Sequence, residues 1–121
     1  MTRFMMTLED AVNLSLFAVQ NGKQGDIFVQ KAPATSIGVL TSAVKEYKKS
    51  NANIEIIGAR PGEKISEVIV TKEEMSKATL IDNYFIIKAD KQNNNEIKEE
   101  YTSLNAKQLD VKEMIEILKK I

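Results

Sequence analysis

The four residues Arg60-Pro61-Gly62-Glu63 are the most restrictive local signal in this sequence, because together they predict a type II β-turn. Proline fits the second turn position, and Gly62 supplies the positive φ that the third position requires. Such a turn brings Arg60 and Glu63 close together, so a fork of hydrogen-bond donors lies beside a pair of acceptors. This pairing suits an anionic ligand that also carries hydroxyl groups. The alternative is a surface turn with a local ion pair.

The composition excludes several kinds of chemistry. The 121 residues include no cysteine and no histidine, so thiol nucleophiles, imidazole bases and the usual zinc ligands are missing. Seventeen basic residues balance seventeen acidic ones, and no overall field therefore favours nucleic acid. Any anion binding has to come from particular arginines. We expect no metal site, although a magnesium ion bound by carboxylates stays open, and we expect no catalytic residue in this chain.

Helical and strand patterns alternate along the chain, which predicts a single α/β domain. Four helices are expected, with N-caps at Thr7, Ser36, Thr71 and Asp110 and with the third helix ending at Lys77. About three strands are expected, at residues 26–30, 54–57 and 84–89. Residues 65–70 fit either a strand or irregular structure. The polar residues 90–100 predict a mobile loop.

Four stretches, taken in order, resemble extended short-chain dehydrogenase/reductase enzymes that act on nucleotide sugars. They are residues 2–7 with Ala11-Val12, residues 25–33, residues 56–67 around the Arg60 turn, and residues 100–103 with Asn105. The most similar members are the configuration-inverting UDP-N-acetylglucosamine 4,6-dehydratases and the epimerases of capsular polysaccharide biosynthesis. The resemblance touches most of the chain and is weakest after Lys88.

Two catalytic hallmarks of those enzymes are missing. The five glycines never fall at the spacing of the dinucleotide-binding fingerprint. Tyr84 and Lys88 match the Tyr-x-x-x-Lys pair literally, but the aromatic and β-branched residues between them predict a strand. In a strand the two residues lie roughly 13 Å apart, at about 3.3 Å per residue, so the lysine cannot lower the pKa of the phenol by contact.

The resemblance therefore implies a fragment: the small C-terminal substrate-binding lobe of such an enzyme, without its N-terminal Rossmann domain. It implies that Arg3 and Arg60 contact the diphosphate of a UDP-sugar and that Glu63 contacts the ribose. Tyr101, Ser103 and Asn105 border the sugar pocket in this interpretation, without an assigned role. NAD(P) is implied for the full-length enzyme only. The chain alone is expected neither to bind NADP strongly nor to turn over UDP-N-acetylglucosamine.

The favoured function is substrate binding for a UDP-N-acetylglucosamine 4,6-dehydratase of surface polysaccharide biosynthesis. A UDP-sugar 4-epimerase of capsule synthesis and a non-catalytic binding or assembly module are the alternatives. No signal peptide and no membrane-spanning run is recognised, so a cytoplasmic location without a membrane or nucleic-acid partner is expected. The first helix and residues 27–29 are expected to expose apolar surface, which predicts self-association if the Rossmann domain is absent.

Overall fold

The computed structural model describes residues 1–89 and 98–121. In this part of the chain, helices and short strands follow one another in the order β1 (Thr2–Phe4), α1 (Leu8–Asn21), β2 (Ile27–Gln30), β3 (Ala34–Ser36), α2 (Ile37–Tyr47), β4 (Val68–Val70), α3 (Lys72–Met75), β5 (Ala78–Ile81), β6 (Tyr84–Ile87), β7 (Tyr101–Thr102) and α4 (Val111–Leu118). The α/β class and the four helices are confirmed. The mobile loop expected at residues 90–100 lies largely outside the described residues.

Side-chain caps begin all four helices where the sequence predicts them. The Thr7 hydroxyl accepts from the Asp10 N–H at 3.0 Å, and the Asp10 carboxylate accepts from the Thr7 N–H, which forms a capping box. Asp110 and Glu113 form the same box on α4. Ser36 caps α2 and Thr71 caps α3. The third helix is shorter than expected, because it ends at Met75 and not at Lys77.

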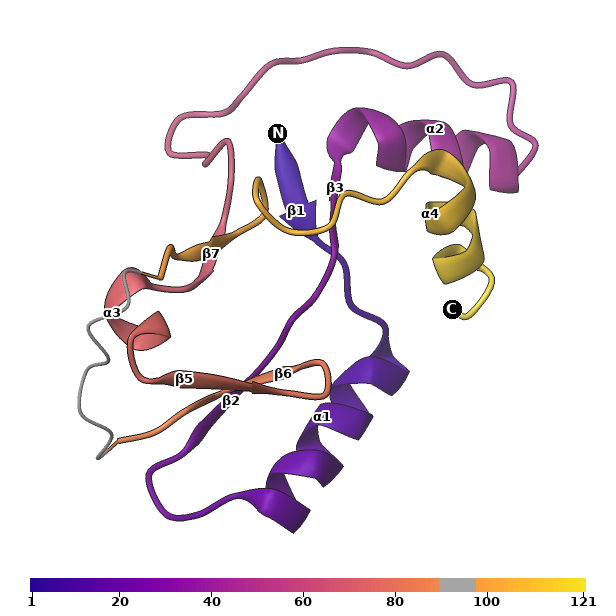
Figure 1. The fold of residues 1–121 in the computed structure, drawn as a ribbon. Coiled ribbons are helices and arrows are strands. Elements are labelled where there is room, and N and C mark those ends of the chain that lie inside the picture. Colours follow the sequence, from indigo (N-terminus) through magenta and orange to yellow (C-terminus); the bar gives the residue numbers. More distant parts are fainter. Residues whose placement is uncertain (90–97) are drawn as a thin grey trace.

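Within the described residues the strands form three small sheets, in which all strand pairs are antiparallel. In the largest sheet the order is β2-β6-β5, and α1 covers one face, where Phe17 stacks on Tyr84 with ring centroids 4.6 Å apart. β1 pairs with β3, and β4 pairs with β7. Figure 1 shows that β1 and β3 join this sheet to a second layer, in which α2 packs against α4.

The strand expected at residues 54–57 is not formed, and that prediction is wrong. Ile54, Ile56 and Ile57 are 54%, 91% and 71% exposed, and residues 54–57 make no backbone hydrogen bond to any residue that the structure describes. A strand needs a neighbouring strand to satisfy its N–H and C=O groups, and no described segment lies alongside this one. Residues 48–67 instead form a long connection that arches from α2 to β4 (Figure 1).

Tyr101 is the centre of the main core. Its ring lies 5.6 Å from that of Phe4 and 5.2 Å from that of Phe85, and its hydroxyl donates to the Ala32 carbonyl at 2.7 Å. Burial raises the pKa of the Tyr101 phenol. A second cluster joins Ala43 of α2 to Leu109 and Met114 at the start of α4. The core therefore ties the N-terminal strand, the sheet and the C-terminal residues into one unit.

Within residues 1–89 and 98–121, no helix is long and apolar enough to span a membrane.

Candidate functional site

The turn predicted at Arg60-Pro61-Gly62-Glu63 is present. Gly62 has φ +80°, and the Glu63 N–H donates to the Arg60 carbonyl at 3.0 Å, as a type II turn requires. The Glu63 carboxylate turns back and accepts from the Arg60 N–H at 2.9 Å. The turn is thus closed by two hydrogen bonds between the same two residues, which holds its backbone in a defined shape.

Arg3 lies beside this turn, although it is 57 residues or more away in the sequence. Its guanidinium donates to the Lys64 carbonyl at 2.8 Å and forms ion pairs with Glu63 at 3.9 Å and with Glu67 at 3.8 Å. A second N–H of the guanidinium donates to the Thr2 carbonyl at 2.8 Å. Strand β1 positions Arg3 by pairing it with Thr35 of β3. The structure thus brings Arg3 and Glu63 together.

Arg60 differs from Arg3 because its guanidinium makes no hydrogen bond or ion pair to residues 1–89 or 98–121. The residue is exposed, and so are its neighbours Glu63 and Lys64. The local ion pair that the sequence allowed between Arg60 and Glu63 is not formed, since Glu63 contacts Arg3 and the Arg60 backbone instead. The Arg60 guanidinium is therefore available to an anion that approaches from solvent.

The three polar residues expected at the sugar pocket have partners within the chain. Tyr101 is buried and bonded to Ala32, and Ser103 is fully buried. The Asn105 side chain accepts from the Thr102 N–H and donates to the Glu100 carbonyl, each within 2.8 Å. These contacts stabilise the path of the chain after β7. The sequence did not reveal this role, because it arises from pairings across up to about a hundred residues.

Tyr84 and Lys88 do not form a catalytic pair. Tyr84 begins β6, which agrees with the predicted strand, and its ring stacks on that of Phe17. Lys88 follows the end of the strand, where its ammonium group donates to the Asp26 carboxylate at 2.8 Å. The Asp26 side chain is 4% exposed, and the hydrogen bond from Lys88 lowers the pKa of its carboxyl group. Lys88 thus fixes the turn before β2.

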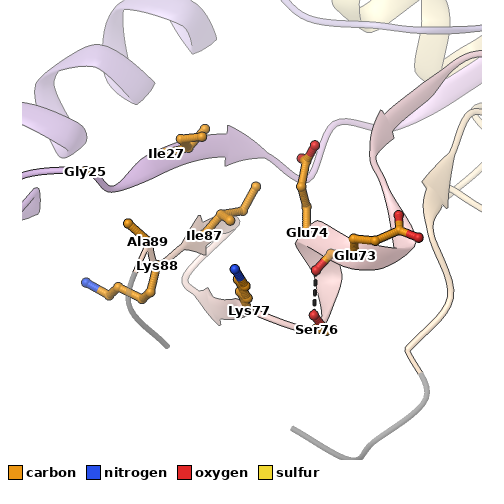
Figure 2. A pocket seen from close by; sticks show the side chains of 9 residues that line it. All are labelled: Gly25, Ile27, Glu73, Glu74, Ser76, Lys77, Ile87, Lys88 and Ala89. Carbon is orange, nitrogen blue, oxygen red and sulfur yellow. Dashed lines mark hydrogen bonds between the residues drawn. The ribbon is translucent and has the colours of Figure 1, made fainter. Parts of the chain in front are cut away.

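A hollow of about 390 Å³ lies beside this ion pair, and it is separate from the contacts of Arg3. Figure 2 shows Glu73 and Glu74 of α3 on one side and Lys88 and Ala89 on the other, with the apolar side chains of Ile27 and Ile87 between them. None of Arg3, Arg60 and Glu63 lines it. No group of three or more acidic side chains within residues 1–89 and 98–121 is arranged to hold a metal ion.

The fold and these contacts define the class of the protein: a small α/β unit whose structure recurs within a longer protein. The X-ray structure of Pen from Bacillus thuringiensis matches it with a TM-score of 0.81 and 33% sequence identity, over 100% of this chain and 38% of that one. The particular family follows from the sequence. Residues 1–89 match the polysaccharide biosynthesis protein family, and the chain belongs to that family.

Curated relatives agree with this membership. The UDP-glucose 4-epimerase of Rickettsia rickettsii is 43% identical over 98% of this chain, and that of Rickettsia canadensis is 42% identical over the same share. The chain spans 38% of the length of each of these relatives. The matches support the resemblance to part of an extended short-chain dehydrogenase/reductase, whereas the specific 4,6-dehydratase is not confirmed.

The Asp26–Lys88 pair predicts a pH dependence of stability. Because the pKa of Asp26 is lower in the folded chain than its ordinary value of 3.8, the pair contributes stability above about pH 4 and loses it as the pH falls through the lowered pKa. Lys88→Met is therefore expected to lower the melting temperature near neutral pH and to have much less effect at about pH 2.

Lys119→Met is the matched control, because it removes an exposed lysine that pairs with Glu116 on the surface of the last helical turn. We expect it to change the melting temperature little at either pH. Equal effects of Lys88→Met at both pH values would contradict the coupling between Asp26 and Lys88.

Proposed function

We propose that this chain is the substrate-binding part of a cytoplasmic enzyme that modifies UDP-sugars for surface polysaccharide biosynthesis. The observation that carries the proposal is the contact of Arg3 with Glu63, which joins two segments that resemble UDP-sugar-binding motifs. In this proposal Arg60 and Arg3 bind the diphosphate, and Glu63 binds the ribose hydroxyls. Guanidinium groups suit this role because they donate two parallel hydrogen bonds to phosphate oxygens.

The two arginines contribute differently. Arg60 offers all of its side-chain donors to the ligand. Arg3 already donates to the carbonyls of Thr2 and Lys64 and faces two carboxylates, so it has fewer N–H groups left for phosphate. Glu63 can still accept from a ribose hydroxyl, because a carboxylate has about four lone-pair sites and only some of them are used here. We therefore expect Arg60 to dominate the affinity.

Removal of the Arg60 guanidinium tests the binding proposal. A charge-assisted hydrogen bond contributes about 1.5–3 kcal/mol, so Arg60→Ala is expected to weaken UDP binding by about 10- to 100-fold. Arg60→Lys should recover part of the loss, since it keeps the charge without the bidentate geometry. Isothermal titration calorimetry with UDP, supported by NMR titration, measures both effects.

Lys112→Ala is the control for this titration, because it removes an exposed positive charge from α4 and leaves the turn unchanged. UDP affinity should stay the same in this variant. Binding of UDP that is insensitive to Arg60→Ala would place the site elsewhere, and a wild-type chain without any response to UDP would argue against the proposal itself.

Two reactions are candidates for the longer enzyme. The resemblance around residues 58–61 favours a UDP-N-acetylglucosamine 4,6-dehydratase, whereas the names of the curated relatives favour a UDP-sugar 4-epimerase. Both begin with oxidation at C4 of the sugar. A dehydratase then releases water across C5 and C6, and an epimerase returns the hydride to the opposite face. NAD(P) supplies the hydride chemistry in such enzymes, and the binding fingerprint for it is missing from these 121 residues.

Product analysis separates the two reactions. We expect a longer protein that contains this chain and a Rossmann domain to convert UDP-N-acetylglucosamine into a 4-keto sugar nucleotide that is lighter by one water. An epimerase would give an isomer of unchanged mass. Mass spectrometry of the reaction mixture distinguishes these products. The 121 residues alone serve as the negative control, and turnover by them would show that catalytic groups have been overlooked.

Apolar surface on α1 motivates a proposal about partners. Leu8, Val12, Leu16 and Val19 follow one another at helical spacing and are 51–84% exposed. Part of this surface is a shallow groove of about 300 Å³. An apolar stripe of this kind is unfavourable in water, so we propose that two copies of the 121-residue chain associate through α1 when no further domain covers it.

Sedimentation velocity at micromolar concentrations tests this association. Leu16→Lys should shift the wild-type dimer toward monomer by placing a charge in the apolar stripe. Asn13→Lys adds the same charge at an exposed polar position of α1 and should leave the dimer intact. A wild-type chain that sediments as a monomer throughout this range would rule out self-association.

A further inference from the structure

Ser103 follows β7 and is fully buried, although serine is a polar residue that is mostly found at the surface. Its hydroxyl contacts β1 and the segment after the Arg60 turn. It lies 2.7 Å from the Thr2 hydroxyl and 3.3 Å from the Thr2 carbonyl, and it accepts from the Glu67 N–H at 2.8 Å. One buried oxygen thus touches two segments that are far apart in the sequence.

The Ser103 hydroxyl makes its hydrogen bonds to groups within the chain. A serine hydroxyl donates once and accepts twice. The Ser103 hydroxyl accepts from the Glu67 N–H, and its proton is shared between two acceptors in Thr2, the carbonyl and the hydroxyl, so its donor and at least one acceptor position are used within the chain. Because Ser103 is also fully buried, its hydroxyl does not reach a sugar in solvent, and any effect on binding has to act through the residues that it holds.

Those residues carry the proposed UDP site. The Ser103 N–H donates to the Glu67 carbonyl at 2.8 Å, which completes an exchange of two hydrogen bonds between these residues. The Thr2 N–H donates to the Ile65 carbonyl at 2.9 Å, and Arg3 donates to the Lys64 carbonyl. These four hydrogen bonds, here called the clamp, fix residues 64–67 directly after the Arg60 turn.

The clamp is the main attachment of the turn to the folded unit. On the other side of the turn, residues 51–59 make no backbone-to-backbone hydrogen bond to any residue that the structure describes. The Arg3–Glu63 ion pair is the direct contact of the turn itself with β1, and at 3.9 Å it is longer than a hydrogen bond. The position of Arg60 relative to Arg3 therefore depends on residues 64–67, and these depend on Ser103 and Thr2.

We propose that Ser103 is a positioning residue for UDP-sugar binding, which acts by holding the Arg60 turn against Arg3 through the Thr2–Ser103–Glu67 contacts. This inference rests on the proposed function, because it assigns Ser103 a part in the same site. Ser103→Ala removes the shared oxygen and leaves the Glu67 N–H without its partner. We expect about a tenfold loss of UDP affinity, because Arg60 and Arg3 then have to be brought together by the ligand.

Thr2 provides a second and milder test, because its hydroxyl contacts the Ser103 hydroxyl, which is part of the clamp. Thr2→Val keeps the shape of the side chain and removes the hydroxyl that bonds to Ser103, whereas Thr2→Ser keeps the hydroxyl. Loss of affinity in Thr2→Val and its recovery in Thr2→Ser would identify the hydroxyl as the cause. This pair also keeps the proposal testable if Ser103→Ala does not fold.

Met114→Ala is the structural control. Met114 is 2% exposed and packs with Ala43 and Leu109 in the cluster between α2 and α4, which includes none of residues 60–67. The variant should lower the melting temperature, but should leave UDP affinity unchanged. A loss of affinity in Met114→Ala equal to that in Ser103→Ala would mean that any loss of stability weakens binding, and would overturn a specific role for Ser103.

Amide hydrogen exchange followed by NMR reports on the clamp without a ligand. In Ser103→Ala the Glu67 amide should exchange about tenfold faster or more, while the Leu109 amide, which donates to the Ala34 carbonyl, keeps its protection. Unchanged exchange at Glu67 would show that Ser103 does not hold this segment.

UDP titration of the same 121-residue variants completes the experiment and separates two kinds of failure. If the wild-type chain binds UDP and Ser103→Ala binds it equally well, the positioning role is overturned and the proposed function stands. If the wild-type chain does not bind UDP, the proposed function and the role of Ser103 in it both fail, whatever the exchange rates show.

Discussion

The attachment of residues 63–67 to β1 is the interaction on which the candidate site depends. The connection between α2 and β4 is about twenty residues long and contains no helix or strand, which is unusual within a small domain. Fixing such a segment costs conformational entropy of about 1–2 kcal/mol per residue. The chain limits this cost by fixing mainly the end of the connection, where Arg3, Thr2 and Ser103 provide partners for its backbone.

The isoleucines of the same connection form an apolar surface that the described part of the chain does not cover. Ile56 is 91% exposed, and Ile54 and Ile57 are more than half exposed, so three apolar side chains within four residues contact mostly water. The apolar face of α1 is exposed in the same way. Single exposed apolar residues are ordinary, whereas two groups of them are accounted for in our proposal by a second copy of the chain or by the Rossmann domain of a longer enzyme. This agrees with a chain that spans 38% of its curated relatives.

Local signals in the sequence predicted local structure well. Thr7, Ser36, Thr71 and Asp110 cap helices because a short side-chain oxygen reaches the N–H groups of the first turn, and this needs only neighbouring residues. The Arg60 turn formed for the same reason, since Pro61 and Gly62 restrict the backbone themselves. The strand expected at residues 54–57 did not form. An apolar pattern indicates only that a strand is possible, whereas pairing needs a distant partner that the described chain does not provide.

The sequence predicted only part of the candidate site, because the contacts of its residues depend on segments that are distant in the sequence. The resemblance singled out Arg3, Arg60 and Glu63, but it could not indicate that Arg3 would use two N–H groups on carbonyl oxygens. It likewise placed Ser103 and Tyr101 at a pocket, whereas both are buried within the fold. Contacts such as Thr2–Ser103, whose partners are 101 positions apart in the sequence, arise only when the complete fold brings distant segments of the chain together.

Solvent exposure limits the strength of binding that this arrangement can achieve. Two unit charges 4 Å apart attract by about 1 kcal/mol in bulk water and by several times more where water is excluded. Arg60 is exposed, and the positive charge of Arg3 is offset by Glu63 and Glu67. A diphosphate bound here would therefore gain only part of the energy that a closed pocket provides. In our proposal the Rossmann domain of the longer enzyme covers this surface, so it strengthens the contacts of Arg60 by excluding water as well as by adding contacts of its own.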